Sequence, residues 1–141
     1  MGRPAFRTMQ EVCVPVSSGH DLVTARREGR DMAVQLGFSA CEATLVATAI
    51  TELVRNIFIY ACQGEIYLSM ANEGAKSGMT VIAVDQGPRI ADIDLAAQVG
   101  YSAAGGIALG LSGIKRIMDE FAITSECGRG TAVTVTKWRR R

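Results

Sequence analysis

A carboxylate and an amide stand one helical turn apart in the most apolar stretch of the chain. Glu52 and Asn56 are separated by four positions, a spacing that places both side chains on one face of a helix. Burying either group is costly unless it finds a partner. A carboxylate there could act as a general base, and an amide oxygen could bind a hard cation such as Mg²⁺. A salt bridge to Arg55 is the structural alternative that this spacing leaves open.

A second candidate follows an apolar strand at Asp85. The segment 85–90 reads Asp-Gln-Gly-Pro-Arg-Ile. A carboxylate at the end of a strand, followed by Gly87, suits recognition of a planar base with an exocyclic amine, because glycine lets a ligand approach the backbone. An ordinary Asx turn leaving a strand is the competing interpretation.

Two glycine-containing segments further along could contact phosphate and base. Residues 105–113 read Gly-Gly-Ile-Ala-Leu-Gly-Leu-Ser-Gly and precede a helical pattern, and backbone donors at a helix N-terminus bind phosphate well. The segment lacks the Gly-Lys-Ser/Thr ending of a Walker A loop, and a flexible loop is its alternative. In residues 128–131 a tight turn precedes the Thr131 hydroxyl, and taken alone this turn is better explained by a plain hairpin.

The elements that must position these residues are read from hydrophobic periodicity. We expect strands at 11–16, 65–71, 79–84, 122–126 and 131–138, and helices at 21–36, 39–61 and 112–121. Pro15 places the first strand at an edge of the sheet. Ser39 and Glu42 have capping-box spacing at the start of the second helix, and Val46, Ile50, Leu53, Ile57 and Ala61 form its apolar stripe. Residues 86–106 are predicted to form a binding loop or lid. This order predicts an α/β two-layer sandwich with helices on one face of a mixed, mostly antiparallel sheet.

The four candidate segments, in this order, resemble the N, G1, G2 and G3 boxes of the GHKL ATPase/kinase superfamily. Within it the chain looks like the anti-sigma-factor serine kinases, and Asn-Ile-x-x-Tyr-Ala and Met-Asp-Glu-Phe favour the RsbT-type switch kinases of the stressosome. The resemblance covers roughly residues 11–138 and rests on the stretches 51–61, 82–88, 105–113, 115–121 and 130–138. It implies the Bergerat/GHKL-type fold and one ATP-binding kinase domain over residues 1–141.

The resemblance also implies a role for each candidate residue. Asn56 would hold Mg²⁺ against the phosphates of ATP, and Glu52 would position or deprotonate the attacking hydroxyl. Asp85 would accept a hydrogen bond from the adenine amine, supported by Thr131, and Gly87 would let the base pack closely. The backbone donors to the phosphates would come from Gly110, Leu111 and Gly113. Phosphoryl transfer would then proceed by positioning and charge neutralisation.

Two positions depart from the family pattern, and they keep alternative functions open. Arg89 stands where family members usually have glycine, and Ala108 where another glycine is common. The implied function is a serine/threonine-protein kinase that phosphorylates a STAS-domain antagonist or scaffold protein and then activates a PP2C-type phosphatase. The alternatives are an anti-sigma factor that sequesters a sigma factor, or a nucleotide-binding pseudokinase.

Composition and net charge indicate which partners and which cellular setting to expect. The formal charge is +1, from 15 basic and 14 acidic residues, so no broad field attracts nucleic acid or an anionic membrane. We expect neither as a partner. The basic end, 137–141, is interpreted as solvated. The four cysteines are widely spaced, which favours small buried residues in a reducing, cytoplasmic setting over a zinc site or a disulfide framework.

Overall fold

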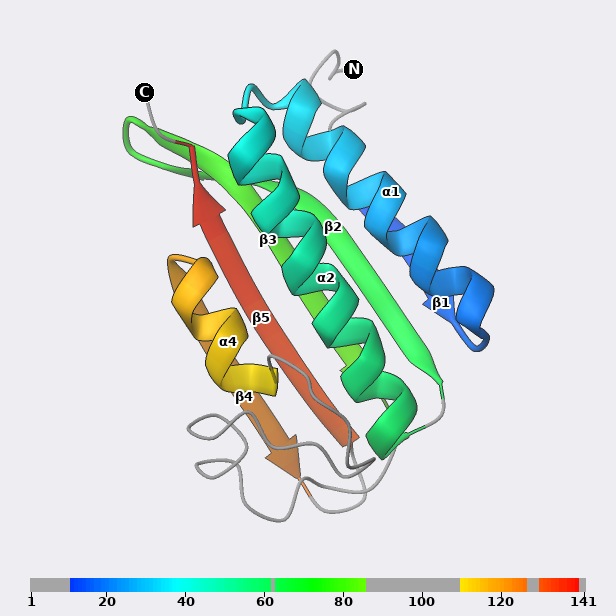
Figure 1. Ribbon diagram of the computed structural model, residues 1–141. Coiled ribbons are helices and arrows are strands. Elements are labelled where there is room, and N and C mark those ends of the chain that lie inside the picture. The colour runs from blue at the N-terminus through cyan, green and yellow to red at the C-terminus, as the bar shows by residue number, and fades with distance from the viewer. Residues whose placement is uncertain (1–10, 62, 86–109, 127–129, 140–141) are drawn as a thin grey trace, which may run out of the picture.

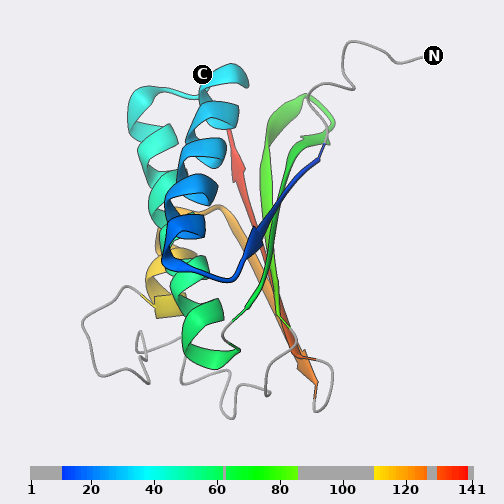
Figure 2. The same cartoon turned by 90° about the vertical axis from the view of Figure 1, so that its right-hand side faces the viewer.

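The computed structural model describes residues 11–61, 63–85, 110–126 and 130–139. Its elements, in chain order, are β1 (Val12–Val16), α1 (Gly19–Gln35), α2 (Ala40–Tyr60), β2 (Gly64–Glu73), β3 (Lys76–Asp85), α4 (Gly110–Ile117), β4 (Glu120–Glu126) and β5 (Gly130–Trp138). The three helices lie side by side on one face of the sheet, with α2 between α1 and α4 (Figure 1). Figure 2 shows these two layers edge-on, with none of the described helices on the other face. The expected two-layer α/β sandwich is confirmed.

The five strands form one sheet in the order β1-β2-β3-β5-β4. Each of the four pairings between described strands is antiparallel, where a mixed, mostly antiparallel sheet was expected. β1 lies at an edge, as Pro15 predicted, because proline has no amide hydrogen to give a second neighbour. Placing β5 between β3 and β4 puts the last strand inside the sheet, with a neighbour on each side.

The core lies between the sheet and the helix layer. Alternate strand residues point into it, since side chains along a strand alternate between faces, and so does the stripe of α2: Val46, Ile50, Leu53 and Ile57 are each at most 2% exposed. Gly29 of α1 packs against Ile50, where an added Cβ would collide with the Ile50 side chain. That contact brings α1 close to α2.

Capping residues determine where the helices begin. Ser39 Oγ accepts the amide hydrogen of Glu42 at 3.1 Å, and Glu42 Oε1 accepts that of Ser39 at 3.2 Å. The predicted capping box is therefore present, and it satisfies donors that the first turn leaves free. Within the described part of the chain, none of the helices has the length and apolar character needed to cross a bilayer.

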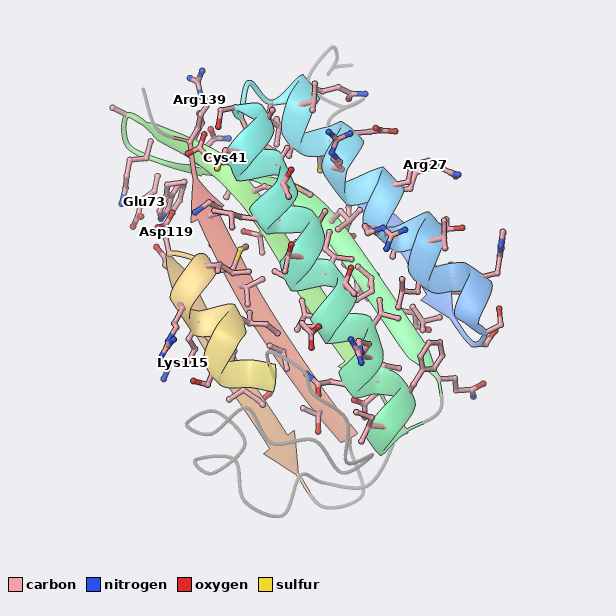
Figure 3. All side chains as sticks on the ribbon, viewed as in Figure 1. Arg27, Cys41, Glu73, Lys115, Asp119 and Arg139 are labelled. Atoms are coloured by element: carbon pink, nitrogen blue, oxygen red, sulfur yellow. The ribbon has the colours of Figure 1, made fainter. Side chains whose placement is uncertain are left out.

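Three local expectations were wrong. α4 begins and ends earlier than predicted, and Phe121 belongs to β4. Cys13 and Cys41 are exposed and not buried; Figure 3 labels Cys41 near the start of α2. Lys137, expected in a solvated end, is buried at 5% exposure because its Nζ donates to the Ile117 carbonyl, 3.0 Å away, at the end of α4.

Candidate active site

One end of the molecule gathers most of the predicted site residues. The end of β3, the start of β5, the C-terminal half of α2 and the first turn of α4 all lie there (Figure 1). Asp85 and Thr131 are direct cross-strand partners in the β3–β5 register. Both are buried, at 6% and 4% exposure. The structure thus joins a carboxylate and a hydroxyl that are far apart in sequence.

Glu52 lies in α2 with its carboxylate buried, at 7% exposure. The Arg55 Nη1 atom is 3.5 Å from Glu52 Oε2, and the Arg55 side chain is itself about half exposed. The salt bridge weighed from the sequence is therefore present. At this length it is a weak hydrogen bond, and it engages one carboxylate oxygen, so it is compatible with a second contact from Glu52 to a ligand.

Asn56 follows one turn later, and the nitrogen of its side-chain amide, Nδ2, is buried without a hydrogen-bond partner among the described residues. An unsatisfied buried amide costs about 1–3 kcal/mol, and such groups in native proteins call for an explanation such as an ion. A half-turn of the amide exchanges its oxygen and nitrogen. The same position can therefore present an oxygen to a hard cation, which fits Mg²⁺.

The first turn of α4 supplies backbone donors at the same end. Gly110, Leu111 and Gly113 are among the first four residues of α4, and the amide hydrogens at the very start of a helix, here those of Gly110 and Leu111, have no partner inside it. The partial positive charge of a helix N-terminus suits phosphate. Ile114, fully buried, anchors the helix in the core. Gly87, Arg89 and Ala108, together with the predicted loop 86–106, lie outside the described residues.

Gly64 lies beside the candidate site, and the sequence did not single it out. It is the register partner of Asp85 across β2 and β3. A Cβ at this position would collide with the Val84 carbonyl and lie 3.2 Å from the Asp85 Cα. Glycine therefore lets β2 lie close beside the Asp85 backbone. Nothing in the sequence signals this, because the register between two strands is a property of the folded sheet.

The Met-Asp-Glu-Phe motif, in contrast, lies away from the site. Asp119 Oδ2 accepts the backbone amide of Trp138 at 2.7 Å, and Glu120 Oε2 accepts the Trp138 indole hydrogen at 2.9 Å. Figure 3 shows Asp119 near the far end of β5, close to Glu73 and away from the end that holds Asp85 and Thr131. This motif holds the end of the last strand in place.

Comparison with known proteins identifies the architecture. A family model described as a histidine kinase-like ATPase domain matches residues 17–137. The chain belongs to the histidine kinase-like ATPase family. It is 43% identical over 128 residues to the serine/threonine-protein kinase RsbT of Bacillus subtilis (strain 168), an alignment that covers 91% of this chain and 96% of that protein. The resemblance drawn from the motifs is thereby confirmed, and so is the prediction of a serine/threonine-protein kinase at the level of its relative.

Solved structures agree at the level of the fold. The RsbU and RsbW domains of Rv1364c from Mycobacterium tuberculosis match with a TM-score of 0.65 at 16% identity, covering 93% of this chain. This chain spans a third of that longer protein (33%). The mycobacterial sensor histidine kinase MprB matches with a TM-score of 0.55 at 14% identity, covering 92% of this chain and 99% of that one. A histidine kinase-like ATPase domain implies ATP as its nucleotide.

Proposed function

We propose that this histidine kinase-like ATPase domain is an ATP-dependent serine/threonine-protein kinase whose active site lies at the Asp85 end of the sheet. The observation that carries the proposal is the buried amide nitrogen of Asn56, which has no partner among the described residues, one turn after the buried Glu52. The 43% identical relative, named a serine/threonine-protein kinase, supports the reaction class.

In this proposal Asp85 reads the adenine. Its carboxylate accepts a hydrogen bond from the exocyclic amine, and Thr131, its register partner, supports that contact. Gly87 leaves room for the base to pack against the backbone. Because Asp85 and Thr131 are buried, they favour adenine over a base that lacks the exocyclic amine. A buried polar group that a ligand leaves without a hydrogen bond costs more binding free energy than one that water can reach.

The phosphates extend from the base toward α2 and α4. Amide hydrogens at Gly110, Leu111 and Gly113 donate to phosphate oxygens. Asn56 holds Mg²⁺, which neutralises phosphate charge when bound. No group of three or more His, Cys, Asp or Glu side chains gathers as a metal site among the described residues. In this proposal the Asn56 amide would supply the protein ligand to the metal, beside the phosphates of the nucleotide.

Glu52 acts on the acceptor hydroxyl. It accepts the proton of a serine or threonine hydroxyl as that oxygen bonds to the γ-phosphorus and the bond from phosphorus to the ADP oxygen breaks. We propose that the acceptor belongs to a STAS-domain protein in a stressosome-type partner-switching pathway. A PP2C-type phosphatase is then the partner that the released kinase activates. Both follow from the resemblance to anti-sigma-factor kinases.

The test separates nucleotide binding from transfer. Purified protein with Mg²⁺ and γ-labelled ATP should transfer label to serine or threonine of a STAS-domain partner. Asp85→Asn should lose nucleotide binding, whereas Glu52→Gln should still bind ATP and lose transfer. A wild-type protein that binds ATP and labels no STAS-domain protein would instead act as a pseudokinase. Co-purification with a sigma factor would indicate an anti-sigma factor.

A further inference from the structure

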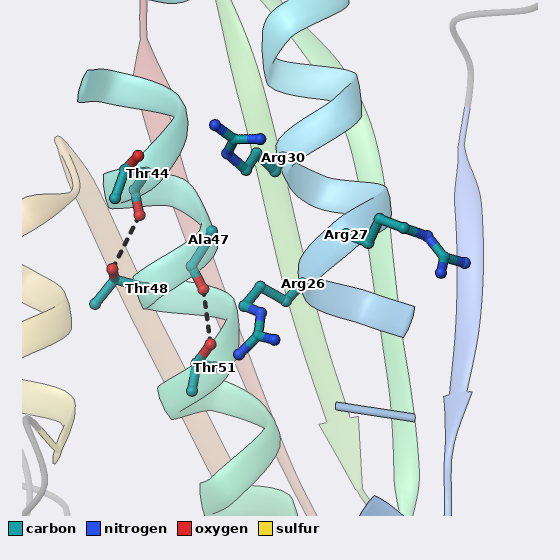
Figure 4. Close-up of a pocket in the computed structure, with 7 residues that line it drawn as sticks. All are labelled: Arg26, Arg27, Arg30, Thr44, Ala47, Thr48 and Thr51. Carbon is teal, nitrogen blue, oxygen red and sulfur yellow. Dashed lines mark hydrogen bonds between the residues drawn. The ribbon is translucent and has the colours of Figure 1, made fainter. Parts of the chain in front are cut away.

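A groove runs between α1 and α2 on the outer side of the helix layer, and the active-site proposal makes no use of it. Its volume is about 440 Å³. Figure 4 shows the side chains that line it. Arg26, Arg27 and Arg30 come from α1, and α2 contributes Thr44, Ala47, Thr48 and Thr51. Thr51 precedes Glu52 in the chain, but successive helical residues point about 100° apart, so the groove and the buried carboxylate lie on different faces of α2.

The floor of this groove, made by α2, offers little hydrogen-bonding capacity. Each of its three threonine hydroxyls donates to the carbonyl four residues earlier, over 2.9 Å to Ala40 and Thr44 and 3.0 Å to Ala47. Two of these bonds are drawn in Figure 4. Their hydroxyl hydrogens are therefore used inside the helix, and the floor meets a ligand mainly through small apolar surface.

The wall, made by α1, carries concentrated positive charge. Arg27 contacts Glu28 at 3.9 Å, with both side chains exposed, a pair that contributes little. Arg26 and Arg30 have no ion pair or hydrogen bond in the described part of the chain. A guanidinium presents several donors in a planar fork that suits carboxylates. The wall therefore leaves most of its hydrogen-bonding capacity for a partner.

Exposed apolar side chains flank these arginines. Val23 and Val34, at 44% and 53% exposure, are the large hydrophobic residues that the described surface exposes. At about 100° per residue, both valines and all three arginines fall within roughly one third of the circumference of α1. The valines stand about 16 Å apart along the axis, at 1.5 Å per residue. The acidic Asp21 and Glu28 project on the opposite side of α1 by the same count.

We propose that this groove docks an acidic amphipathic helix of a protein partner, at a surface separate from the nucleotide site. Carboxylates of the partner would pair with Arg26 and Arg30, and its apolar residues would cover Val23, Val34 and the floor. A third helix lying along a pair of packed helices follows ordinary ridge-and-groove geometry. The charge is local, in a chain with a net charge of only +1, which favours a short acidic segment over a long polyanion such as nucleic acid.

The direct test uses a labelled peptide and charge reversal. The probe is a cross-linked helical peptide of about 20 residues with Glu on successive turns and two Leu residues spaced like Val23 and Val34. Its matched control peptide has Gln in place of Glu. In fluorescence anisotropy, Arg26→Glu/Arg30→Glu should weaken binding of the Glu peptide by at least about tenfold, the sum of two modest ion pairs. The control Arg116→Glu, on exposed α4 surface, should change it less than about twofold.

Two further measurements show whether the peptide binds in the groove and not at the nucleotide site. Methyl resonances of Thr44, Ala47 and Val23 should shift on titration with the Glu peptide, and the affinity for ATP should stay unchanged in the double variant. A peptide with Lys in place of Glu should bind the double variant more tightly than wild type. Circular dichroism and thermal unfolding confirm that every variant is folded.

The proposal is overturned if the Gln peptide binds as tightly as the Glu peptide, if methyl shifts appear elsewhere, or if no Glu peptide binds. It is equally overturned if duplex DNA of matched charge displaces the Glu peptide at equal concentration, which would indicate a general anion surface. None of these outcomes bears on ATP binding or transfer, so the docking proposal and the kinase proposal can fail separately.

Discussion

The carboxylate of Glu52 is buried beside a guanidinium that is half in solvent. Arg55 Nη1 lies 3.5 Å from Glu52 Oε2, and their side chains are 46% and 9% exposed, respectively. Removing one partner of a buried pair leaves an uncompensated charge, whereas removing both leaves none. Arg55 therefore stabilises the fold by compensating a carboxylate that the proposed reaction requires.

We predict that Arg55→Met lowers the free energy of unfolding by about 1 kcal/mol, a value reduced from the fully buried case because Arg55 is half exposed. In a Glu52→Gln background the same change should be nearly neutral. Urea unfolding of the four proteins in this double-mutant cycle measures the coupling. An equal loss in both backgrounds would show that Arg55 stabilises the protein by packing and not through Glu52.

Asp21, at the start of α1, contributes to the stability of the fold by an amount that depends on pH. Its Oδ2 accepts the backbone amide hydrogens of Ser17 at 2.8 Å and Ser18 at 3.0 Å. These bonds, that from Ser17 first, lower the pKa of Asp21 below its ordinary value of 3.8. A lowered pKa in the folded state stabilises the fold above the unfolded value, and this stabilisation disappears as pH falls through the folded value.

We therefore predict that the difference in unfolding free energy between wild type and Asp21→Asn is largest at neutral pH. It should begin to shrink as pH falls toward 3.8 and approach a constant below the folded pKa. Urea unfolding across this range measures it, with Asp31→Asn, another exposed α1 carboxylate, as the control. A difference that stays constant with pH would refute the role assigned to the two amide bonds.

Among the secondary-structure elements, the pairing of β2 with β3 holds the backbone at Asp85 in position. Gly64 sits opposite Asp85, and a Cβ there would collide with the backbone of Val84. The obstacle is backbone, so neither strand can yield by rotating a side chain. Any larger residue must push β2 and β3 apart at the position that holds Asp85.

We predict that Gly64→Ala lowers the unfolding free energy by about 1–3 kcal/mol, the usual cost of overpacking, and also weakens ATP binding. The matched control is Gly19→Ala, where an added Cβ meets nothing within 4 Å, and which should be neutral or slightly stabilising. Thermal unfolding and isothermal titration with ATP check both. Normal ATP affinity in a folded Gly64→Ala protein would contradict the supporting role of Gly64.

Tertiary contacts also explain why α4 ends, and β4 begins, earlier than the hydrophobic periodicity predicts. Helical spacing continues through Phe121, but Lys137 binds the Ile117 carbonyl and the Asp119 amide donates to the Thr136 carbonyl at 2.9 Å. Both partners come from β5, so they end α4 and begin β4 in a way that local sequence does not encode. The Ser39 capping box, in contrast, acts within four residues and was predictable.

For the molecule as a whole, the sequence could predict the ranges of the strands and helices but not the order of the strands in the sheet. Periodicity predicts five strands and three helices with their approximate ranges, because burial follows pattern. It does not say that β5 lies between β3 and β4. Asp85 and Thr131 become neighbours only through that order, and their joint role came from the family resemblance. Gly64 lies opposite Asp85 through the register of the β2–β3 pair, and no motif marks that register.

The proposed site, assembled from α2, β3, α4 and β5, would link nucleotide binding to the stability of the entire fold. A ligand that binds only the folded state stabilises it by RT ln(1 + [L]/Kd), about 2.7 kcal/mol at a hundredfold excess over Kd. For a chain of 141 residues that corresponds to a rise in Tm of several degrees. If Mg²⁺ bridges Asn56 and the phosphates, part of that rise should depend on the metal.

We predict that Mg-ATP raises the Tm of wild type by about 5–10 °C under these conditions, and that EDTA removes much of the shift. Asn56→Leu replaces the amide, whose nitrogen has no partner within the described ranges, with an apolar side chain of similar size. It should raise the Tm without nucleotide, because a buried unsatisfied group is removed. The same variant should show a smaller shift with Mg-ATP and little response to EDTA. Differential scanning fluorimetry of both proteins without nucleotide, with Mg-ATP, and with Mg-ATP and EDTA gives the Tm values to compare. A full metal-dependent shift in Asn56→Leu would mean that another group holds the metal, and Asn56 would then be a structural amide of α2.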